Sequence, residues 1–299
     1  IVTAESPIRV GEKSHHGPGL HAYSVVSKCL DSIPLYRQSK QFARADIPLT
    51  RSTLCDLFHR CAKELKPLYV RLLEKIVASK YVNADETRMP VQAKKKVRTA
   101  WVWTFLSSSM IGFVFSFSRS GQTPIEVLAD STGKLQVDGH TGYNKVCLPS
   151  SRERVGCWAH CRRKFFDAKS TAPIASEALE LILSLYEVEY EAAARNVLKS
   201  SEHQAMRKLK SQDVLDELSE WLLERRKDSP PKSPLGRAVT YALNQWSRLS
   251  MFVDDVELAL DNNIAERALR PIALGRKNFL FVGNKQAGEN LAILQSLVS

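Results

Sequence analysis

Residues 98–118 read RTAWVWTFLSSSMIGFVFSFS, and this stretch decides the fold. Two runs rich in aromatic and β-branched side chains flank three serines, a pattern typical of two antiparallel strands joined by a turn. The preceding run, Lys80–Asp85 (KYVNAD), has strand character too and ends in an acid. The sequence therefore predicts three consecutive antiparallel strands near the middle of the chain.

The segment after the hairpin extends this sheet. A helical pattern covers 122–131, and two short strands are predicted at 134–138 and 154–158, the first again ending in an acid. Three antiparallel strands, a helix and two further strands form an α/β order, compatible with a ribonuclease-H-like mixed sheet flanked by helices.

The segment before the sheet is predicted to be helical at 20–30, at 34–43 and from Ser52 or Thr53 onward. Pro67 is expected to kink or divide the last helix, because proline removes a backbone donor. A helix, a short turn and a capped helix that carries Arg51 and Arg60 match a helix-turn-helix reader of DNA. They match a plain helical hairpin equally well.

The segment after the sheet has helical spacing at 174–198, 204–226 and 234–248. The apolar stripes of these helices indicate packed core. The whole pattern predicts four regions: an N-terminal helical region (1–78), the first part of an α/β core (79–170), an all-α insertion (171–255) and the last part of the core (256–299).

Charge is the first indication of a partner. The 299 residues include 43 Lys and Arg against 32 Asp and Glu, a formal net charge of +11. Such a surplus favours a polyanion, either nucleic acid or anionic lipid, although a solvated basic surface is the alternative. No apolar run approaches the roughly 20 residues that span a bilayer. No leader sequence is evident, and scattered cysteines suit a reducing compartment, so we expect a cytoplasmic protein without a membrane partner.

Three acids stand out by position. Asp85 and Asp138 end two predicted strands, and Glu266 lies in the first or second turn of a helix that Asp261 or Asn262 can cap. If the two strands are neighbours, their carboxylates lie side by side, and a crossing helix can add the third. Such oxygen-rich sites suit Mg²⁺. Two ions about 3.5–4 Å apart clamp the attacking and leaving oxygens of a phosphodiester.

A structural alternative exists for each acid. Asp85 and Asp138 can serve as turn residues, and Glu266 can pair with Arg270 one helical turn later. Glu86 competes with Asp85, but the two point to opposite faces of a strand. The alternation of the preceding strand favours Asp85.

Five ordered motifs carry a resemblance to a known family. They are Ala84-Asp85-Glu86-Thr87, Leu135-Gln136-Val137-Asp138-Gly139, Gly156-Cys157-Trp158-Ala159-His160 with Arg162–Phe166, Leu260–Asn263 with Ala265-Glu266-Arg267, and Gly275-Arg276-Lys277-Asn278. In this order they resemble the insertion-sequence-66-type transposases, which are bacterial DDE enzymes. The likeness extends upstream through Gly19-Leu20, 34–38 and 51–54, so it covers nearly the whole chain.

The resemblance implies a ribonuclease-H-like catalytic domain with a helical insertion between the second and third acids. Asp85, Asp138 and Glu266 would be the catalytic acids and would hold Mg²⁺ or Mn²⁺, as two ions. Such enzymes free the 3′-hydroxyl ends of a transposon and join them to target DNA, with water and then the DNA 3′-OH as nucleophile. The rivals are a nuclease that cuts without joining and an inactive remnant that only binds DNA.

The resemblance also implies partners and a location. DNA is expected as transposon ends and target, bound by a homo-oligomer, with element-encoded accessory proteins as possible helpers in a bacterial nucleoid. The cysteine-rich amino-terminal portion of the family is absent from this sequence and the end at Ser299 looks clipped, so we expect a catalytic core fragment.

The remaining candidates divide into basic and structural residues. The residues expected to contact phosphate are Arg162, Arg163, Lys164, Arg267, Arg270, Arg276 and Lys277. The run Lys94-Lys95-Lys96 is expected to be a solvated loop within 92–97. Cys157, His160 and Cys161 lack a fourth zinc ligand nearby, so we assign Cys157 and His160 a structural role. Asn262 and Asn263 are expected to cap the helix of Glu266 or to orient it.

Overall fold

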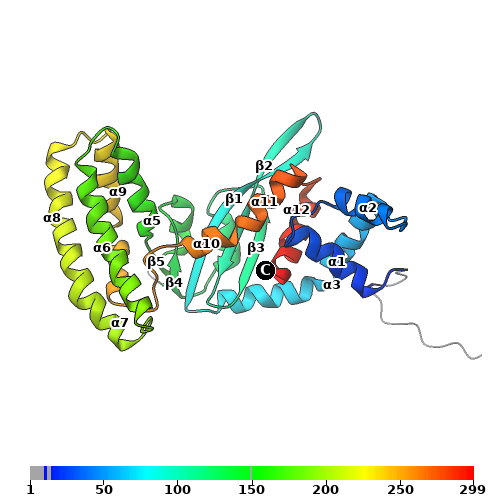
Figure 1. Cartoon of the computed structure of the whole chain (residues 1–299), viewed down its shortest axis with the longest axis horizontal. Coiled ribbons are helices and arrows are strands. Elements are labelled where there is room, and N and C mark those ends of the chain that lie inside the picture. The colour runs from blue at the N-terminus through cyan, green and yellow to red at the C-terminus, as the bar shows by residue number, and fades with distance from the viewer. Residues whose placement is uncertain (1–9, 12–14, 149) are drawn as a thin grey trace, which may run out of the picture. The chain divides into compact units, whose positions relative to one another are not determined.

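The computed structural model describes residues 10–11, 15–148 and 150–299, so the start of the expected N-terminal region lies mostly outside it. Its strands are β1 (Tyr81–Ala93), β2 (Lys96–Leu106), β3 (Ile111–Ser116), β4 (Gly133–Gln136) and β5 (Arg152–Val155). They form a sheet in the order β3-β2-β1-β4-β5. The first three strands pair antiparallel, and β4 pairs parallel with β5. This is the predicted mixed, ribonuclease-H-like sheet with helices (Figure 1).

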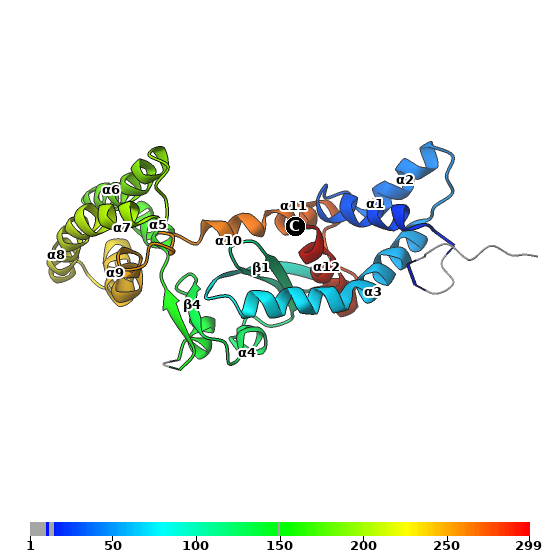
Figure 2. The same ribbon diagram turned by 90° about the horizontal axis from the view of Figure 1, so that it is seen from below.

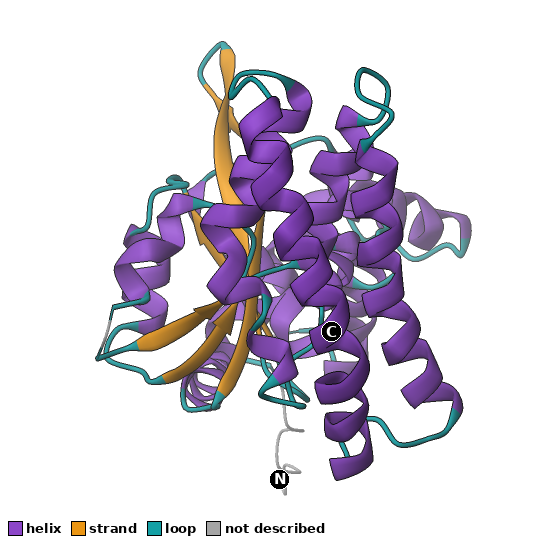
Figure 3. Ribbon diagram, turned by 90° about the vertical axis from the view of Figure 1, so that its left-hand side faces the viewer, coloured by secondary structure: helices purple, strands orange, loops and turns teal. Residues whose placement is uncertain are grey.

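The β1–β2 hairpin is longer than predicted. β1 does not end at Asp85 but continues to Ala93, which pairs with Lys96 across a two-residue turn. Lys94 and Lys95 form that turn, and Lys95 has a φ of 60°. The expected loop over 92–97 is therefore the tip of a hairpin, which extends beyond the neighbouring strands in Figure 3. The strand continues because the backbone N–H and C=O groups after Asp85 form hydrogen bonds with β2.

The last strand is shorter and earlier than predicted. β5 ends at Val155, and Trp158 begins helix α5 (Trp158–Ala168). The physical reason is that the N–H of Trp158 bonds to the carbonyl of Leu260, at 3.0 Å. The N–H of Gly156 likewise bonds to the carbonyl of Arg248, at 2.9 Å. The strand ends here because the N–H groups of Gly156 and Trp158 bond to carbonyls far along the chain and not to a neighbouring strand.

Contacts divide the described chain into two compact units. The first comprises the residues up to Thr132 together with Asn144–Val146 and Ala265–Ser299. The second comprises Gly133–Tyr143 and Cys147–Ile264.

In the first unit, helices α3 (Arg51–Val77), α11 (Arg270–Phe279) and α12 (Lys285–Val298) pack on the β1–β3 part of the sheet. Helices α1 (Pro18–Cys29), α2 (Leu35–Arg44) and α4 (Gln122–Leu128) pack against α3. Helix α10 (Asn263–Ala268) spans the boundary between the two units. Helix α12 packs on both β3 and α3 (Figures 1 and 2). Met89, Val91, Phe113 and Leu291 belong to one buried hydrophobic cluster. The hydroxyl of Ser296 in α12 accepts a bond from the N–H of Phe113, at 2.7 Å.

Helix α3 begins before the predicted caps, Ser52 and Thr53, and it is not divided. Its N-cap is Thr50, whose hydroxyl accepts a bond from the N–H of Thr53, at 3.1 Å. Pro67 lies inside one continuous helix. Because proline has no N–H, the carbonyl of Lys63, four residues earlier, loses its helical hydrogen bond. Lys63 and Pro67 are both exposed, so water can bond to that carbonyl instead.

The second unit contains a helical bundle between β5 and α10. Its helices are α5, α6 (Ala175–Ala194), α7 (Ser201–Met206), α8 (Gln212–Asp228) and α9 (Pro234–Leu249). The helix predicted over 204–226 is α7 and α8, linked by a π-helical turn at Arg207–Ser211. Arg207 is 1% exposed, donates to both carboxylate oxygens of Glu189 and donates to the carbonyls of Phe252 and Leu258. This one side chain fastens α6 to the segment that follows α9.

Within the described part of the chain, no helix combines the length and the apolar character needed to cross a membrane.

Candidate active site

Asp85 lies in the first half of β1, opposite Thr104 of β2. Its Oδ1 accepts a hydrogen bond from the N–H of Glu86, at 2.9 Å. The Glu86 side chain belongs to the other face of the strand. There its carboxylate accepts a bond from Nε of Arg119, at 2.9 Å, and is only 2% exposed. Glu86 therefore has a structural partner on the opposite face from Asp85.

The face of β1 that carries Asp85 also carries Thr87. Nη1 of Arg276 in α11 donates to Oγ1 of Thr87, at 2.8 Å, and to the carbonyl of Arg88, at 2.5 Å. Leu269 and Ile272 belong to the same hydrophobic cluster as Met89 and Val91, on this face. The segment that follows Glu266 is therefore fastened to the face of β1 that carries Asp85, and α11 lies beside β1 in Figures 1 and 2.

Glu266 lies in α10, a helix of six residues that begins at Asn263. Asp261 forms the N-terminal turn, because its Oδ1 accepts a bond from the N–H of Asn263, at 3.0 Å. Its Oδ2 accepts from Nδ2 of Asn263, at 2.7 Å, and from the hydroxyl of Tyr186, at 2.9 Å. Glu266 therefore has the early helical position that the sequence predicts, and Asp261 supports the start of that helix.

Asp138 lies two residues past the end of β4, in a tightly bonded loop of the second unit. Its Oδ1 accepts from the N–H of His140, at 2.9 Å. Nη2 of Arg154 donates to the main-chain carbonyls of Asp138 and His140, at 2.5 and 2.9 Å. A Cβ on Gly139 would lie 2.7 Å from Cε2 of Tyr241 in α9. Arg154 and Tyr241 thus shape the loop that presents Asp138.

The donor chemistry of the three acids suits Mg²⁺ or Mn²⁺, since hard cations prefer carboxylate oxygens. Asp85 and Glu266 belong to the first unit, whereas Asp138 belongs to the second. Among the described residues, no three His, Cys, Asp or Glu side chains form a group that could hold a metal ion. The structure thus holds Asp85, Asp138 and Glu266 each in a defined local setting.

The seven predicted phosphate-contacting residues lie on α5, α10 and α11. Six of them are exposed, and these are Arg162, Arg163, Lys164, Arg267, Arg270 and Lys277. Arg276 differs, because its guanidinium is bonded to β1 and is half-buried. Nζ of Lys164 lies 4.6 Å from the ring centre of Tyr241. Six of the side chains are therefore accessible to a polyanion, whereas Arg276 is hydrogen-bonded to Thr87 of β1.

Cys157 and His160 contact each other, with 3.3 Å between Sγ and Nδ1. Sγ of Cys157 also accepts a bond from the N–H of Asn262, at 3.2 Å. Burial raises the pKa of Cys157 to about 11, so the thiol stays protonated at neutral pH. Within the second unit, Cys157 thus connects the start of α5 to the segment before α10.

Sequence patterns did not identify Arg154, Tyr186 or Tyr241. Their roles depend on contacts with distant residues: Arg154 bonds to His140, Tyr186 to Asp261, and the ring of Tyr241 lies against Gly139. The one local signal is Gly139 beside Asp138, since a glycine there permits the close approach of an aromatic ring.

The mixed sheet and the helical bundle between β5 and α10 define the class of the fold as ribonuclease-H-like. The family model described as "Transposase IS66 family" matches residues 13–290. The chain therefore belongs to the IS66 family of transposases.

Three relatives of this chain are proteins of Sinorhizobium fredii (strain NBRC 101917 / NGR234). "Uncharacterized protein y4jD" is 36% identical over all of this chain and 62% of its own length. "Uncharacterized protein y4qI" is 31% identical and "Uncharacterized protein y4hP" 29% identical, each over all of this chain and 58% of its own length. The chain spans about three fifths of the length of these relatives.

Proposed function

We propose that this chain is the catalytic core of a transposase that cleaves DNA at transposon ends and transfers the freed strands into target DNA. The catalytic acids are Asp85, Asp138 and Glu266, and the cofactor is Mg²⁺ or Mn²⁺, as two ions. The partners are transposon-end and target DNA, bound by a homo-oligomer, with accessory proteins of the element as further candidates.

Family membership and one structural observation support this proposal. The segment after Glu266 is bonded through Arg276 to Thr87, two residues from Asp85 on the same strand face. Asp85 therefore lies on one face of β1, and Glu266 lies on α10, the helix directly before α11. Helix α11 is bonded to that same face of β1. Asp138, on its own bonded loop, is the third.

The metal ions, when bound, stabilise the charge on the attacking and leaving oxygens of the phosphodiester. The chain's own part is to supply and orient carboxylates. The N–H of Glu86 orients Oδ1 of Asp85, and the N–H of His140 orients Oδ1 of Asp138. Asp261 supports the first turn of the helix that carries Glu266. The exposed basic residues of α5 and α10–α11 bind the DNA backbone.

An assay with labelled transposon-end DNA, a target plasmid and Mg²⁺ tests this function. Joined products in Mg²⁺, absent in EDTA, are the expected result. Nicked DNA without joining would indicate a nuclease. A DNA complex without any new product would indicate a binding remnant, and no binding at all would contradict the proposal in full.

A further inference from the structure

The β1–β2 hairpin extends beyond β3, the strand beside it (Figure 3). β2 pairs with β1 along its whole length, but β3 pairs with β2 only from Trp101 onward. On the other edge of the hairpin, Pro90 and Gln92 of β1 form backbone hydrogen bonds with Val282. Among the described residues, the last part of the hairpin, residues 93–99, is therefore a two-stranded ribbon, which we name the hairpin tip.

The hairpin tip belongs to a stretch of sequence that contains basic residues and no acids. Residues 87–125 include six Lys and Arg and not one Asp or Glu. Four of the six are on the tip, and all four are exposed: Lys94, Lys95, Lys96 and Arg98. Within the described part of the chain, no carboxylate is within ion-pair distance of any of these four side chains. Their positive charge is therefore not neutralised by the protein.

The segment that lies against β1 is basic as well. Residues 267–288, which contain α11 and Val282, include five Lys and Arg and no Asp or Glu. Nη1 of Arg276 donates to Oγ1 of Thr87, at 2.8 Å, so this second basic stretch is bonded to the hairpin strand. Neither stretch has acids of its own to cancel its positive field, and such a field attracts polyanions.

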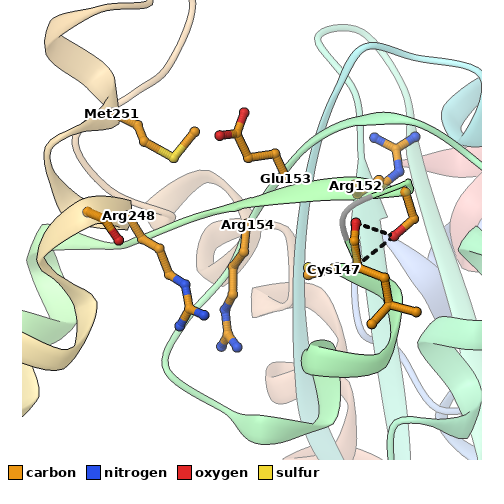
Figure 4. Close-up of a pocket in the computed structure, with 9 residues that line it drawn as sticks. Cys147, Arg152, Glu153, Arg154, Arg248 and Met251 are labelled. Carbon is orange, nitrogen blue, oxygen red and sulfur yellow. Dashed lines mark hydrogen bonds between the residues drawn. The ribbon is translucent and has the colours of Figure 1, made fainter.

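The arginines of the second unit are in a different setting. In the cavity of about 560 Å³ in Figure 4, Glu153 is a lining residue together with Arg154 and Arg248. Arg154 also donates to the main-chain carbonyls of Asp138 and His140. Acceptors of the protein itself thus already serve that cavity, whereas the basic groups of the hairpin tip face solvent.

Two arginines of the hairpin rest on aromatic rings. The guanidinium carbon of Arg98 is 4.5 Å from the ring centre of Phe117, and that of Arg88 is 5.5 Å from the ring centre of Trp101. Such cation–π contacts restrict the side chain, and the exposed N–H groups stay available to a phosphate. These groups are thus partly ordered before a ligand binds, which lowers the entropy cost of binding.

Resting on the proposed function, we propose that the hairpin tip binds the sugar-phosphate backbone of duplex DNA, whatever its base sequence. This contact adds to those of α5 and α10–α11. A duplex carries one negative charge per about 1.7 Å of its axis, so a small tip can meet several phosphates at once. Lysine is a flexible point charge, and phosphate contacts carry no base information. A protein partner is disfavoured, because protein interfaces have an apolar core and Val97 alone is a large apolar side chain among residues 93–99, all of which the structure describes.

Replacing the three lysines of the tip tests this contact. Binding of a DNA duplex to the full chain is measured in EDTA over a range of NaCl concentrations. The triple variant Lys94→Gln, Lys95→Gln, Lys96→Gln is expected to lower the slope of log K against log salt by about 2–3 and to weaken binding about 100-fold at about 0.1 M salt. Glutamine is no more strained than lysine at the φ of 60° of Lys95. The corresponding triple arginine variant keeps the charge and is expected to keep the slope.

The matched control is the triple variant Lys63→Gln, Lys66→Gln, Lys75→Gln. These lysines are exposed on α3 of the same unit, so the control loses the same charge, and its slope should change by less than about 1. Circular dichroism checks that each variant is folded. Equal slope changes in the two glutamine variants would overturn the tip as a DNA site and leave the proposed function intact. A reduced slope in the arginine variant would overturn it too, because the loss would then not come from charge. Wild-type protein that does not bind DNA would overturn both proposals.

Two further arms test base sequence and the class of ligand. A transposon-end duplex and a shuffled duplex of the same length are expected to lose the same slope in the tip glutamine variant. A loss confined to the transposon end would overturn the sequence-independent contact. Vesicles of phosphatidylserine and phosphatidylcholine are expected to show no binding that depends on the tip. Vesicle binding that needs the three lysines, with DNA slopes unchanged, would overturn the DNA assignment in favour of an anionic membrane.

Discussion

Nη1 of Arg276 donates a hydrogen bond to Oγ1 of Thr87, at 2.8 Å, across 189 positions of sequence. This bond fastens α11, which follows Glu266, to the strand face that carries Asp85. The helical bundle is inserted between β5 and α10, so the chain must return to β1 after it. Arg276 secures that return.

Replacing the acids separates catalysis from binding. Asp85→Asn, Asp138→Asn and Glu266→Gln are each expected to reduce strand joining by more than about 100-fold, because loss of even an outer partner of a metal ligand costs about 10–100-fold. DNA binding in EDTA is expected to remain, since the exposed basic residues are unchanged. Glu86→Gln is the control and should keep joining activity. Wild-type joining by all three acid variants would contradict the site assignment.

Variants of Arg276 and Lys277 distinguish a basic residue that stabilises the fold from one that binds DNA. Arg276→Met removes the bonds to Thr87 and to the carbonyl of Arg88, and we expect about 1–2 kcal/mol lower free energy of unfolding. Lys277→Met changes an exposed side chain and should leave stability within about 0.5 kcal/mol while weakening DNA binding. Urea unfolding and DNA titration of both variants measure this. Equal stability of the two would show that the Arg276 bonds contribute nothing.

Gly139 and Tyr241 form a steric pair beside Asp138. A methyl group at position 139 would lie 2.7 Å from the Tyr241 ring, so Gly139→Ala is expected to cost about 1–3 kcal/mol. Adding Tyr241→Ala removes the obstacle, so the double variant should be less destabilised than the sum of the single variants. Thermal unfolding of the four proteins gives the coupling energy. Strict additivity would mean that the ring moves aside without penalty.

Arg207 is expected to be the most sensitive residue of the bundle. Arg207→Met removes the guanidinium from Glu189, which keeps only its contact with His203, and from several carbonyls; breaking a buried ion pair costs about 3–5 kcal/mol. Changing Glu189 to Leu as well should restore much of the stability, because apolar replacement of a buried pair is often neutral. Lys210→Met removes an exposed pair with Glu191 and should cost about 1 kcal/mol or less. Chemical denaturation ranks these variants, and a cost for Arg207→Met no larger than that control would refute the buried-clamp interpretation.

Cys157 links stability to alkaline pH. Its pKa rises from the ordinary 9.0 to about 11 on folding, because burial disfavours the thiolate. The resulting stability is fully present below pH 9.0 and is lost as the pH rises toward about 11. The free energy of unfolding of wild type should therefore fall more steeply over this interval than that of Cys157→Ala. Parallel pH curves would show that this thiol does not change its pKa on folding.

The sequence by itself determined the strands of the hairpin, most of the helices, the mixed sheet and the family. These depend on short-range rules: side-chain alternation along a strand and the spacing of apolar residues along a helix. The positions of Asp85 on a strand and Glu266 early in a helix followed from the same rules, because each depends on only a few neighbouring residues. The identity of the acids as catalytic groups rests on the family motifs.

Only the tertiary structure decided where strands end and which polar groups meet. β1 continues past Asp85 because β2 pairs with it, and β5 stops before Trp158 because the carbonyl of Leu260 takes the Trp158 N–H. Arg154 on the Asp138 loop and Arg276 on Thr87 bond across long stretches of chain. The reason is that a buried donor must find an acceptor wherever the fold places one, and periodicity along the sequence contains no information about that partner.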